Sequence, residues 1–200
     1  MTLFWKRLFD ITASSIGLLV LLPVFMVLAI WIKRDSAGPV FFRQHRVGKN
    51  GRLFSIHKFR SMYLDTEKVS RLTVGADSRI TPSGRFIRKY KLDELPQLID
   101  VVVGNMSLVG PRPEVPEFMN LYPTEQRQKI LSVRPGITDR AAIEMVDEND
   151  ILMQYENPHQ AYVNVIMPLK ARYYLQYIEH ISLAEDIKII LATLKKIVSR

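Results

Sequence analysis

The first patterned segment of the chain is an apolar, uncharged run close to the N-terminus. From Ile11 to Ile32 it reads ITASSIGLLVLLPVFMVLAIWI, and these about 22 residues would form a helix about 33 Å long, enough to cross a bilayer. Pro23 lies within the run, where it removes a backbone hydrogen bond and favours a kink. Pairs of basic residues flank the run on both sides: Lys6 and Arg7, then Lys33 and Arg34.

This arrangement of charges favours a re-entrant membrane helix hairpin over residues 1–35. Positive charge prefers the cytoplasmic side of a membrane, and a helix that enters, bends and leaves by the same face keeps both basic pairs there. A straight span would leave one pair outside, and a buried helix of a soluble domain would not need the flanking charges. Residues 36–200 are then the cytoplasmic domain.

Residues 39–62, PVFFRQHRVGKNGRLFSIHKFRSM, predict a β-hairpin. Two short runs of aromatic and β-branched residues surround Gly48-Lys49-Asn50-Gly51, and Asn-Gly is a strong hairpin signal. The segment 36–64 carries no acidic residue. It carries six basic ones: Arg43, Arg46, Lys49, Arg52, Lys58 and Arg60. Such a hairpin would face lipid headgroups and a lipid phosphate, or would only tether the chain to anionic lipid.

The remaining pattern is mostly helical. Residues 65–84 are polar and predict a loop near 73–77 and a turn at 82–84, and a helical pattern begins at Arg85. The stretch 93–104, DELPQLIDVVVG, predicts a helix with Asp93 at its N-cap or in its first turn and Gly104 at its end. A further helix is predicted over 114–131.

The C-terminal stretch 183–200, LAEDIKIILATLKKIVSR, predicts an amphipathic helix. Its apolar positions share one face: Leu183, Ile187, Ile190, Leu191, Leu194, Ile197 and Val198. Such a helix can lie in a membrane interface with its lysines toward lipid phosphates, or it can pack on the domain core. The fold class is therefore α+β and mostly helical: a membrane helix kinked at a proline, a β-hairpin, and a helical domain that ends in this amphipathic helix.

Composition and charge narrow the function classes. An apolar content of 48% indicates a folded chain, and the absence of cysteine excludes disulfides, a thiolate nucleophile and Cys-ligated zinc. The four histidines lack HExxH or similar spacing, so a zinc site of that kind is not expected. A formal charge of +8 indicates a polyanionic partner: nucleic acid, an anionic membrane or a phosphorylated substrate.

The candidate chemistry lies in KLDEL, where Asp93 and Glu94 follow the basic stretch RFIRKYK, residues 85–91. As a helix cap, Asp93 would need only the helix behind it, with Glu94 paired to a neighbouring arginine. As a reactive centre, an ionised Asp93 could attack phosphorus and form an acyl-phosphate, with Arg, Lys or Mg²⁺ holding the phosphate oxygens. The residues alone leave both interpretations open.

Two arginines beside prolines are candidate phosphate ligands. In Gly110-Pro111-Arg112-Pro113 the prolines fix the backbone around Arg112, which aims a guanidinium with little ordering cost, and Arg134 precedes Pro135-Gly136 in a similar way. The chain has neither GxxxxGK[ST] nor GxGxxG, so an ordinary nucleotide-binding loop is not supported.

The order of these blocks resembles a known family. A hydrophobic N-terminus, FFRQHRVGKNGRLFSIHKFRSM, LDELPQLIDVVVGNMSLVGPRPE and RPGIT resemble the bacterial sugar transferases, monotopic polyprenyl-phosphate phosphoglycosyl transferases of the small, catalytic-domain-only type. The resemblance covers nearly the whole chain. It implies a re-entrant helix in the cytoplasmic leaflet of the bacterial inner membrane, and transfer of a phosphosugar from a nucleoside diphosphate sugar, UDP-sugar here, to undecaprenyl phosphate.

The resemblance also implies roles for individual residues. The family works by a ping-pong mechanism through a covalent phosphosugar on the Asp of the Asp-Glu pair, with Mg²⁺ required, so Asp93 matches the nucleophile and metal ligand and Glu94 its partner. Arg112 with Pro113 matches the nucleotide and phosphate loop. Basic positions around the site are matched by Lys58, Arg60 and Arg88. The expected partners are UDP-sugar, undecaprenyl phosphate and membrane lipid, with no nucleic acid and with a homodimer as a possible assembly.

The tail departs from the family pattern. After RPGIT the chain continues with Asp139-Arg140-Ala141-Ala142 and the acidic run EMVDEND, 144–150, and Tyr174 stands where the family has an Asp. Either Asp139 or the acidic run is a candidate replacement for that carboxylate. Two rival functions remain: a membrane-anchored basic adaptor that binds anionic lipid or nucleic acid, and a hydrolase of lipid pyrophosphates that uses the same Asp93 without a polyprenyl acceptor.

Overall fold

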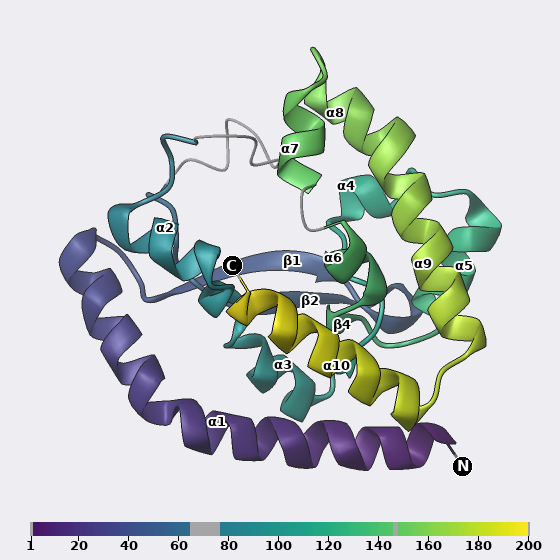
Figure 1. The fold of residues 1–200 in the computed structure, drawn as a ribbon, viewed down its shortest axis with the longest axis horizontal. Coiled ribbons are helices and arrows are strands. Elements are labelled where there is room, and N and C mark those ends of the chain that lie inside the picture. The colour runs from purple at the N-terminus through teal and green to yellow at the C-terminus, as the bar shows by residue number, and fades with distance from the viewer. Residues whose placement is uncertain (1, 65–76, 146–147, 200) are drawn as a thin grey trace.

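The computed structural model describes residues 2–64, 77–145 and 148–199 (Figure 1). Most of the predicted loop at 73–77 and part of the acidic run 144–150 therefore lie outside the described residues. The elements follow in the order α1 Thr2–Asp35, β1 Phe41–Val47, η1 Lys49–Gly51, β2 Leu53–Phe59, α2 Pro82–Lys89, η3 Leu92–Glu94, α3 Gln97–Val103, β3 Ser107–Val109, α4 Pro116–Met119, α5 Thr124–Leu131, β4 Gly136–Thr138, α6 Arg140–Glu144, α7 Glu148–Met153, α8 Pro158–Ala161, η4 Tyr162–Ile166, α9 Met167–Glu179 and α10 Leu183–Val198. The α+β class with mostly helical content is confirmed.

The N-terminal apolar segment forms α1, a single helix of 34 residues that continues through Pro23. It runs along the lower edge of the molecule in Figure 1 and bends upward at the left, as an internal proline leads one to expect. The helix from Leu3 to Asp35 is long and apolar enough to cross a membrane.

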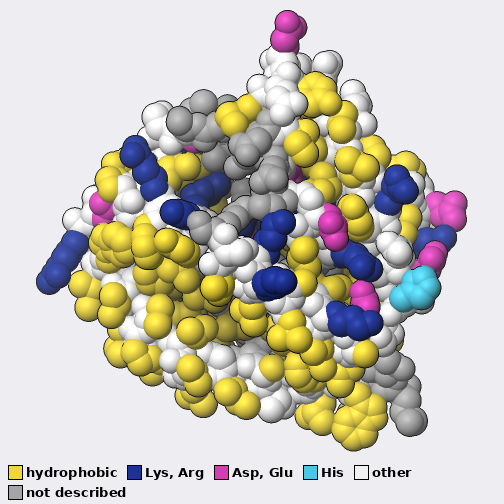
Figure 2. Space-filling model, viewed as in Figure 1, with side chains coloured by type: hydrophobic (Ala, Val, Ile, Leu, Met, Phe, Trp, Pro, Cys, Tyr) yellow, Lys and Arg dark blue, Asp and Glu magenta, His cyan; other side chains and the backbone are white. Residues whose placement is uncertain are grey.

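Both ends of α1 pack against the rest of the chain, whereas much of its middle is exposed. Near its start Asp10 and Ser14 are 1% and 0% exposed, and near its end Ile32 is 0% exposed and packs with Phe59 of β2 and Ile87 of α2. Between these contacts, large apolar side chains are exposed: Ile16, Leu19, Val20, Leu22, Val24, Met26 and Val27. Figure 2 shows hydrophobic side chains gathered along this lower part of the molecule.

The predicted β-hairpin is confirmed. β1 and β2 pair antiparallel from Phe41 opposite Phe59 to Val47 opposite Leu53. The connection includes η1 and is longer than a two-residue turn, with Asn50 at φ 57° and Gly51 at φ 77°. These two residues supply the positive φ values that Asn and Gly tolerate best.

The helix after the polar stretch begins earlier than predicted. α2 starts at Pro82, inside the segment expected to be a turn. Thr81 caps it, because its Oγ1 accepts a hydrogen bond from Gly84 N at 3.0 Å, and proline is well tolerated in the first turn of a helix.

The helix around Asp93 begins later than predicted. Asp93 lies in η3, a separate 3₁₀ turn, and α3 starts only at Gln97, so Asp93 does not cap α3. Pro96 has no N–H and cannot continue α-helical hydrogen bonding through this point. The predicted end at Gly104 is confirmed, with φ of 103°.

The single helix predicted over 114–131 is wrong. The structure has two helices there, α4 and α5, and Pro123 between them has an extended ψ of 140°. The hydrophobic pattern of the sequence also did not predict the parallel pair of β3 and β4. In this pair Ser107 lies opposite Gly136 and Val109 lies opposite Thr138. Strands of three residues carry too few positions to show a period of two.

The C-terminal amphipathic helix is confirmed as α10, and its packing is now defined. Asp186 and Ile189 are 0% and 3% exposed and face the domain. Much of the predicted apolar face is exposed instead, namely Ile187, Leu191, Leu194 and Val198. The alternative in which this face packs on the domain core is therefore wrong for these four positions.

Candidate active site

Asp93 and Glu94 occupy η3, between α2 and α3. Lys91 precedes the turn in the left-handed region, at φ 56°, and Leu92 packs against the apolar cluster that joins the end of α1 to β2 and α2. The turn is thus fixed on its N-terminal side by apolar packing and on its C-terminal side by Pro96. Its backbone holds two adjacent carboxylates at the edge of the β-hairpin.

Glu94 is bound by two cations. Lys58 Nζ of β2 lies 2.7 Å from Glu94 Oε1, and Arg112 donates from Nη2 to Oε1 at 2.6 Å and from Nη1 to Oε2 at 3.3 Å. Burial alone would raise the pKa of Glu94, but the charges of Arg112 and Lys58 outweigh it and hold this pKa well below its usual range. Glu94 is therefore ionised and fixed in place.

Asp93 has the opposite surroundings. It is 8% exposed, and its Oδ1 is a buried oxygen with no hydrogen-bond partner among the described residues. Burial and the neighbouring charge of Glu94 raise the pKa of Asp93, while the charges of Lys58, Arg88 and Lys91 oppose that rise. A buried carboxylate oxygen without a partner is costly and is characteristic of functional sites.

Lys58 is placed by a contact between β2 and α3. The carboxylate of Asp100, 0% exposed, accepts the backbone N–H of His57 at 2.8 Å and lies 2.8 Å from His57 Nδ1. Residues alternate across a strand, so fixing His57 on one face directs Lys58 to the other, toward Glu94. Burial lowers the pKa of Lys58, and Glu94 opposes that change.

Arg112 lies in a loop that is held from both sides. Arg46 of β1 donates to Pro113 O at 3.0 Å, and Val47 N donates to Glu114 O at 2.9 Å. Glu94 raises the pKa of Arg112 well above its usual value, more than burial lowers it. The loop begins at Gly110, where an added Cβ would lie 2.5 Å from Arg134 O, so the two backbones touch.

The structure brings together only part of the predicted substrate-binding set. Lys58, Arg112 and Glu94 are in contact, Pro113 flanks Arg112, and the charge of Arg88 reaches Asp93. Their roles toward a substrate stay predictions.

Two predicted binding arginines make other contacts. The Arg60 guanidinium donates to Pro39 O at 2.7 Å and to Ser36 O at 2.8 Å, so it fastens the end of α1 to the hairpin. Arg134 donates from Nε to Gly104 O at 2.9 Å, at the end of α3. The sequence cannot separate an arginine that binds backbone carbonyls from one that faces a ligand, because the side chain suits both.

Several residues that build the site were not predicted from the sequence. Asp100 orients β2, Arg46 holds the Arg112 loop, and Tyr162 donates to buried Glu114 at 2.9 Å. Asp100 lies in a helix of apolar residues, and a charged side chain among apolar ones was the available signal for a buried partner.

The divergent tail contributes to the surroundings of Arg112. Asp139 caps α6 by accepting Ala142 N at 2.8 Å, and burial raises its pKa to about 6. Tyr174 is 1% exposed, and its hydroxyl has no hydrogen-bond partner among the described residues. Negative charge on either group would raise the pKa of Arg112. Asp139 thus lies within electrostatic reach of Arg112.

A divalent cation fits one part of this site. Over residues 2–64, 77–145 and 148–199, no group of three or more His, Cys, Asp or Glu side chains could hold a metal. Mg²⁺, however, commonly uses one or two carboxylates and completes its shell with substrate phosphates and water. The unpartnered Oδ1 of Asp93 suits such a role, because both oxygens of Glu94 already bind cations.

Comparison with known proteins identifies the family that this fold and site belong to. The sequence model of the family described as bacterial sugar transferase matches residues 1–200. The chain belongs to the bacterial sugar transferase family.

Three relatives illustrate the range of that family. An undecaprenyl-phosphate glucose phosphotransferase of Komagataeibacter xylinus is 41% identical over 96% of this chain and 35% of its own length. The galactosyl transferase CpsE of Streptococcus agalactiae is 38% identical over 95% of the chain and 41% of its own length. The sugar transferase EpsL of Bacillus subtilis is 44% identical over 69% of the chain and 67% of its own length. The chain thus spans well under half the length of the first two.

Proposed function

We propose that this chain transfers a phosphosugar from a UDP-sugar to undecaprenyl phosphate and so initiates the assembly of a membrane-linked glycan. The observation that carries the proposal is the contrast between the two carboxylates. Glu94 is bound by Lys58 and Arg112, whereas the neighbouring Asp93 Oδ1 is buried and has no hydrogen-bond partner within the described part of the chain. The names of the relatives, which include an undecaprenyl-phosphate glucose phosphotransferase, support the same reaction class.

In the first proposed step, an Asp93 carboxylate oxygen attacks the phosphorus that carries the sugar. A new P–O bond forms to Asp93, the P–O bond to the nucleotide breaks, and UMP leaves with the bonding electron pair. Arg112 and Lys58 lie on the Glu94 side of the turn, where their charges can stabilise the phosphate oxygens in the transition state.

In the second proposed step, a phosphate oxygen of undecaprenyl phosphate attacks the same phosphorus. The P–O bond to Asp93 breaks, the carboxylate is restored, and undecaprenyl-diphosphate-sugar is the product. Mg²⁺, with Asp93 as a ligand, would neutralise phosphate charge when bound. Because one covalent intermediate separates the two substrates, the mechanism is ping-pong.

The membrane features support a site at the lipid interface. α1 has an exposed apolar middle, and α10 has an exposed apolar stripe that includes Leu191 and Leu194. We infer that the protein lies in the cytoplasmic leaflet of the bacterial inner membrane, with α1 re-entrant. The phosphate of a membrane-bound polyprenyl chain would then lie at the depth of the domain surface.

The adaptor and the hydrolase are rival functions, and each differs from the transferase in the chemistry that it requires. An adaptor that binds anionic lipid gives no reason for a buried Asp93 oxygen that lacks a partner among the residues described. The ion pairs of Lys58 and Arg112 with Glu94 also offset part of the positive charge that such an adaptor would use. A hydrolase would use the same Asp93 but would not need a polyprenyl acceptor.

The test is release of UMP from a panel of UDP-sugars by the full chain in detergent with Mg²⁺, with and without undecaprenyl phosphate. We expect multiple turnovers only with the lipid, at most one UMP per protein without it, and neither with Asp93→Asn. An Asp93→Asn variant that retains full turnover would overturn the mechanism, and multiple turnovers without lipid would establish the hydrolase. Lipid binding with no UMP release from any donor, by protein with an unchanged melting temperature, would favour the adaptor.

A further inference from the structure

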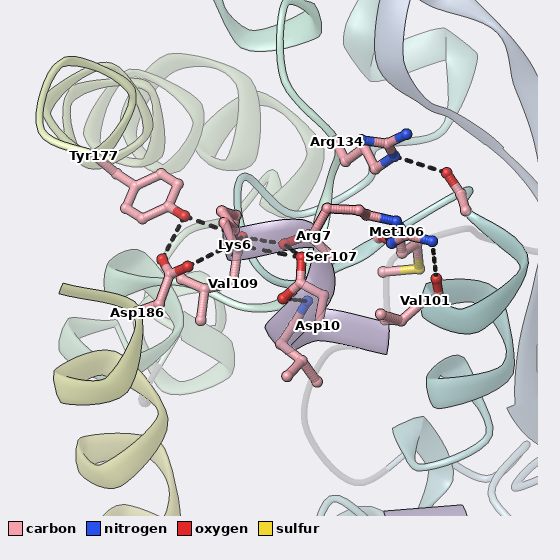
Figure 3. Close-up of polar contacts among 12 residues, drawn as sticks. Lys6, Arg7, Asp10, Val101, Met106, Ser107, Val109, Arg134, Tyr177 and Asp186 are labelled. Atoms are coloured by element: carbon pink, nitrogen blue, oxygen red, sulfur yellow. Dashed lines mark hydrogen bonds and ion pairs between the residues drawn. The ribbon is translucent and has the colours of Figure 1, made fainter. Parts of the chain in front are cut away.

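A buried ion network at the start of α1 joins elements that are far apart in the sequence (Figure 3). Lys6 is 8% exposed and donates from Nζ to Asp186 Oδ2 of α10 at 2.5 Å and to Val109 O of β3 at 3.1 Å. The hydroxyl of Tyr177, in α9, donates to Asp186 Oδ1 at 2.7 Å. One lysine thus holds α1, α10 and β3 at a single point.

The second carboxylate of the network fixes the same strand. Asp10 Oδ2 accepts a hydrogen bond from Ser107 Oγ at 2.7 Å, and Oδ1 accepts one from Leu108 N at 3.2 Å. Lys6 Nζ lies 3.8 Å from Asp10 Oδ2. Breaking a buried ion pair by removing one partner leaves an uncompensated charge, so this network tolerates little displacement.

The neighbouring Arg7 holds the segment that leads into the strand. It donates from Nη2 to Val101 O at 2.8 Å and from Nη1 to Met106 O at 3.2 Å. Successive turns of α1 therefore bind the end of α3 and every residue of β3, and the strand follows the position of the helix.

The strand held in this way ends three residues before Arg112. From Val109 the chain passes directly into Gly110-Pro111-Arg112, and Gly110 N donates to Thr138 O at 3.1 Å. Proline fixes one backbone torsion in this short connection, so a shift of Val109 is carried to Arg112 rather than absorbed. Arg112 in turn binds Glu94.

We infer that Lys6, Asp10 and Asp186 are positioning residues for Arg112: they set the guanidinium at the active site from the membrane-facing helices α1 and α10. This inference rests on the proposed transferase function. It assigns the N-terminal basic residue a catalytic consequence in addition to its place in the charge pattern of the membrane segment. A displacement of about 1 Å at a catalytic group can cost on the order of a hundredfold in rate.

The expected effect is on the donor half-reaction. Lys6→Met removes the donor to Val109 O and leaves Asp186 without its cation, so the single-turnover rate of UMP release should fall at least tenfold. Lys6→Arg retains the charge and should recover part of the loss. Tyr177→Phe keeps Lys6 and removes only the hydroxyl that lies 2.7 Å from Asp186 Oδ1 and 3.1 Å from Val109 O, so it should give a smaller fall in a protein that folds normally.

The experiment is a double-mutant cycle in liposome-reconstituted full chain, with the UDP-sugar that the donor panel identifies. If Lys6 acts through Arg112, then Lys6→Met should slow UMP release much less in an Arg112→Lys background than in the parent. The same comparison with Tyr177→Phe covers the case in which Lys6→Met does not fold. Lys129→Met is the matched control, because it breaks an exposed ion pair with Glu125.

The outcomes separate this inference from the function it rests on. Independent, multiplicative losses in the two backgrounds would overturn the positioning role, as would a Lys6→Met variant that is as active as Lys129→Met. Failure of the parent protein to release UMP from any donor would instead overturn the proposed function.

Discussion

At the residue scale, the adjacent carboxylates Asp93 and Glu94 differ in the side chains that bind them. Two cations hold the pKa of Glu94 low despite burial, and burial with the charge of Glu94 raises the pKa of Asp93. The sequence placed both residues next to basic side chains but could not show which carboxylate those side chains bind. That distinction depends on β2 and on the loop at 110–113, which approach η3 only in the folded chain.

This electrostatic coupling predicts opposite pH shifts for two variants. Asp93 must be ionised to attack phosphorus, so the rate falls as pH drops through its raised pKa. Glu94→Gln removes a charge that raises the pKa of Asp93, and the acid limb should move to lower pH. Arg88→Gln removes a charge that lowers it, and the limb should move to higher pH.

The measurement is the pH dependence of single-turnover UMP release, compared by the position of the acid limb rather than by its height. Both variants can be slower than the parent without affecting the comparison. Shifts in the same direction for the two variants would show that the limb does not report Asp93.

The raised pKa of Asp139 predicts that the folding stability of the protein changes over a defined pH range. Burial raises its pKa from 3.8 to about 6 in the folded protein, so the folded state holds this proton more tightly than the unfolded state does. Stability is therefore lost as pH rises from about 4 to about 6, and a pKa change of that size corresponds to ~3 kcal/mol at most. Asp139→Asn removes this loss, and asparagine can still accept the hydrogen bond from Ala142 N that caps α6.

The check is the melting temperature in detergent at two pH values. At pH 8 Asp139→Asn should melt on the order of 5 °C above the parent, and at pH 4 the two should melt together. An equal difference at both values would mean that the carboxylate charge is not the cause.

At the element scale, the exposed apolar stripe of α10 is the feature that packing alone does not explain. Leu191 and Leu194 are 61% and 54% exposed, although the opposite side of the helix buries Asp186 and Ile189. The lower part of Figure 2 shows hydrophobic side chains extending across the face formed by α1 and the elements beside it. A helix with this distribution fits a membrane interface.

This placement predicts that charge on the stripe weakens membrane association. The double variant Leu191→Glu, Leu194→Glu places two charges where we expect lipid, and each leucine contributes about 1.5–3 kcal/mol when fully buried, so partition into liposomes should fall at least tenfold. Leu121→Glu is the control, because Leu121 is 50% exposed in the connection between α4 and α5. Flotation with liposomes of anionic lipid measures the effect, and equal losses for both variants would contradict the assignment.

Elements with a long or chemically distinct pattern were predictable from the sequence. α1 has an apolar run with basic flanks, the hairpin has Asn50-Gly51, and α10 has one apolar face. The 3₁₀ turn at Asp93 and the pairing of β3 with β4 were not predicted. The turn depends on Leu92 packing against α1, and the pairing depends on the contact of Gly110 with Gly136, which are tertiary interactions without a local period.

At the scale of the whole molecule, both ends of α1 attach to the same body. Lys6 and Asp10 bind β3 and α10, while Asp35 near the other end accepts hydrogen bonds from Ser83 N and Oγ at 3.0 and 2.6 Å. A helix that crossed the bilayer would have its ends on opposite sides, and these two sets of contacts could not form together. Contacts at both ends therefore favour a re-entrant α1 more strongly than the charge pattern did.

The last prediction follows from that arrangement and uses the absence of natural cysteines. Three variants each carry one cysteine. Leu3→Cys and Lys33→Cys place it near the two ends of α1, and Thr124→Cys places it on α5 in the domain. With a membrane-impermeant maleimide, all three should stay unlabelled in intact spheroplasts and become labelled after lysis, because a re-entrant helix keeps both of its ends on the cytoplasmic side. Labelling of Leu3→Cys alone from outside would establish a spanning helix. In that case the contacts of Lys6 with Val109 and Asp186 could not exist in the membrane, and the route from α1 to Arg112 would be lost with them.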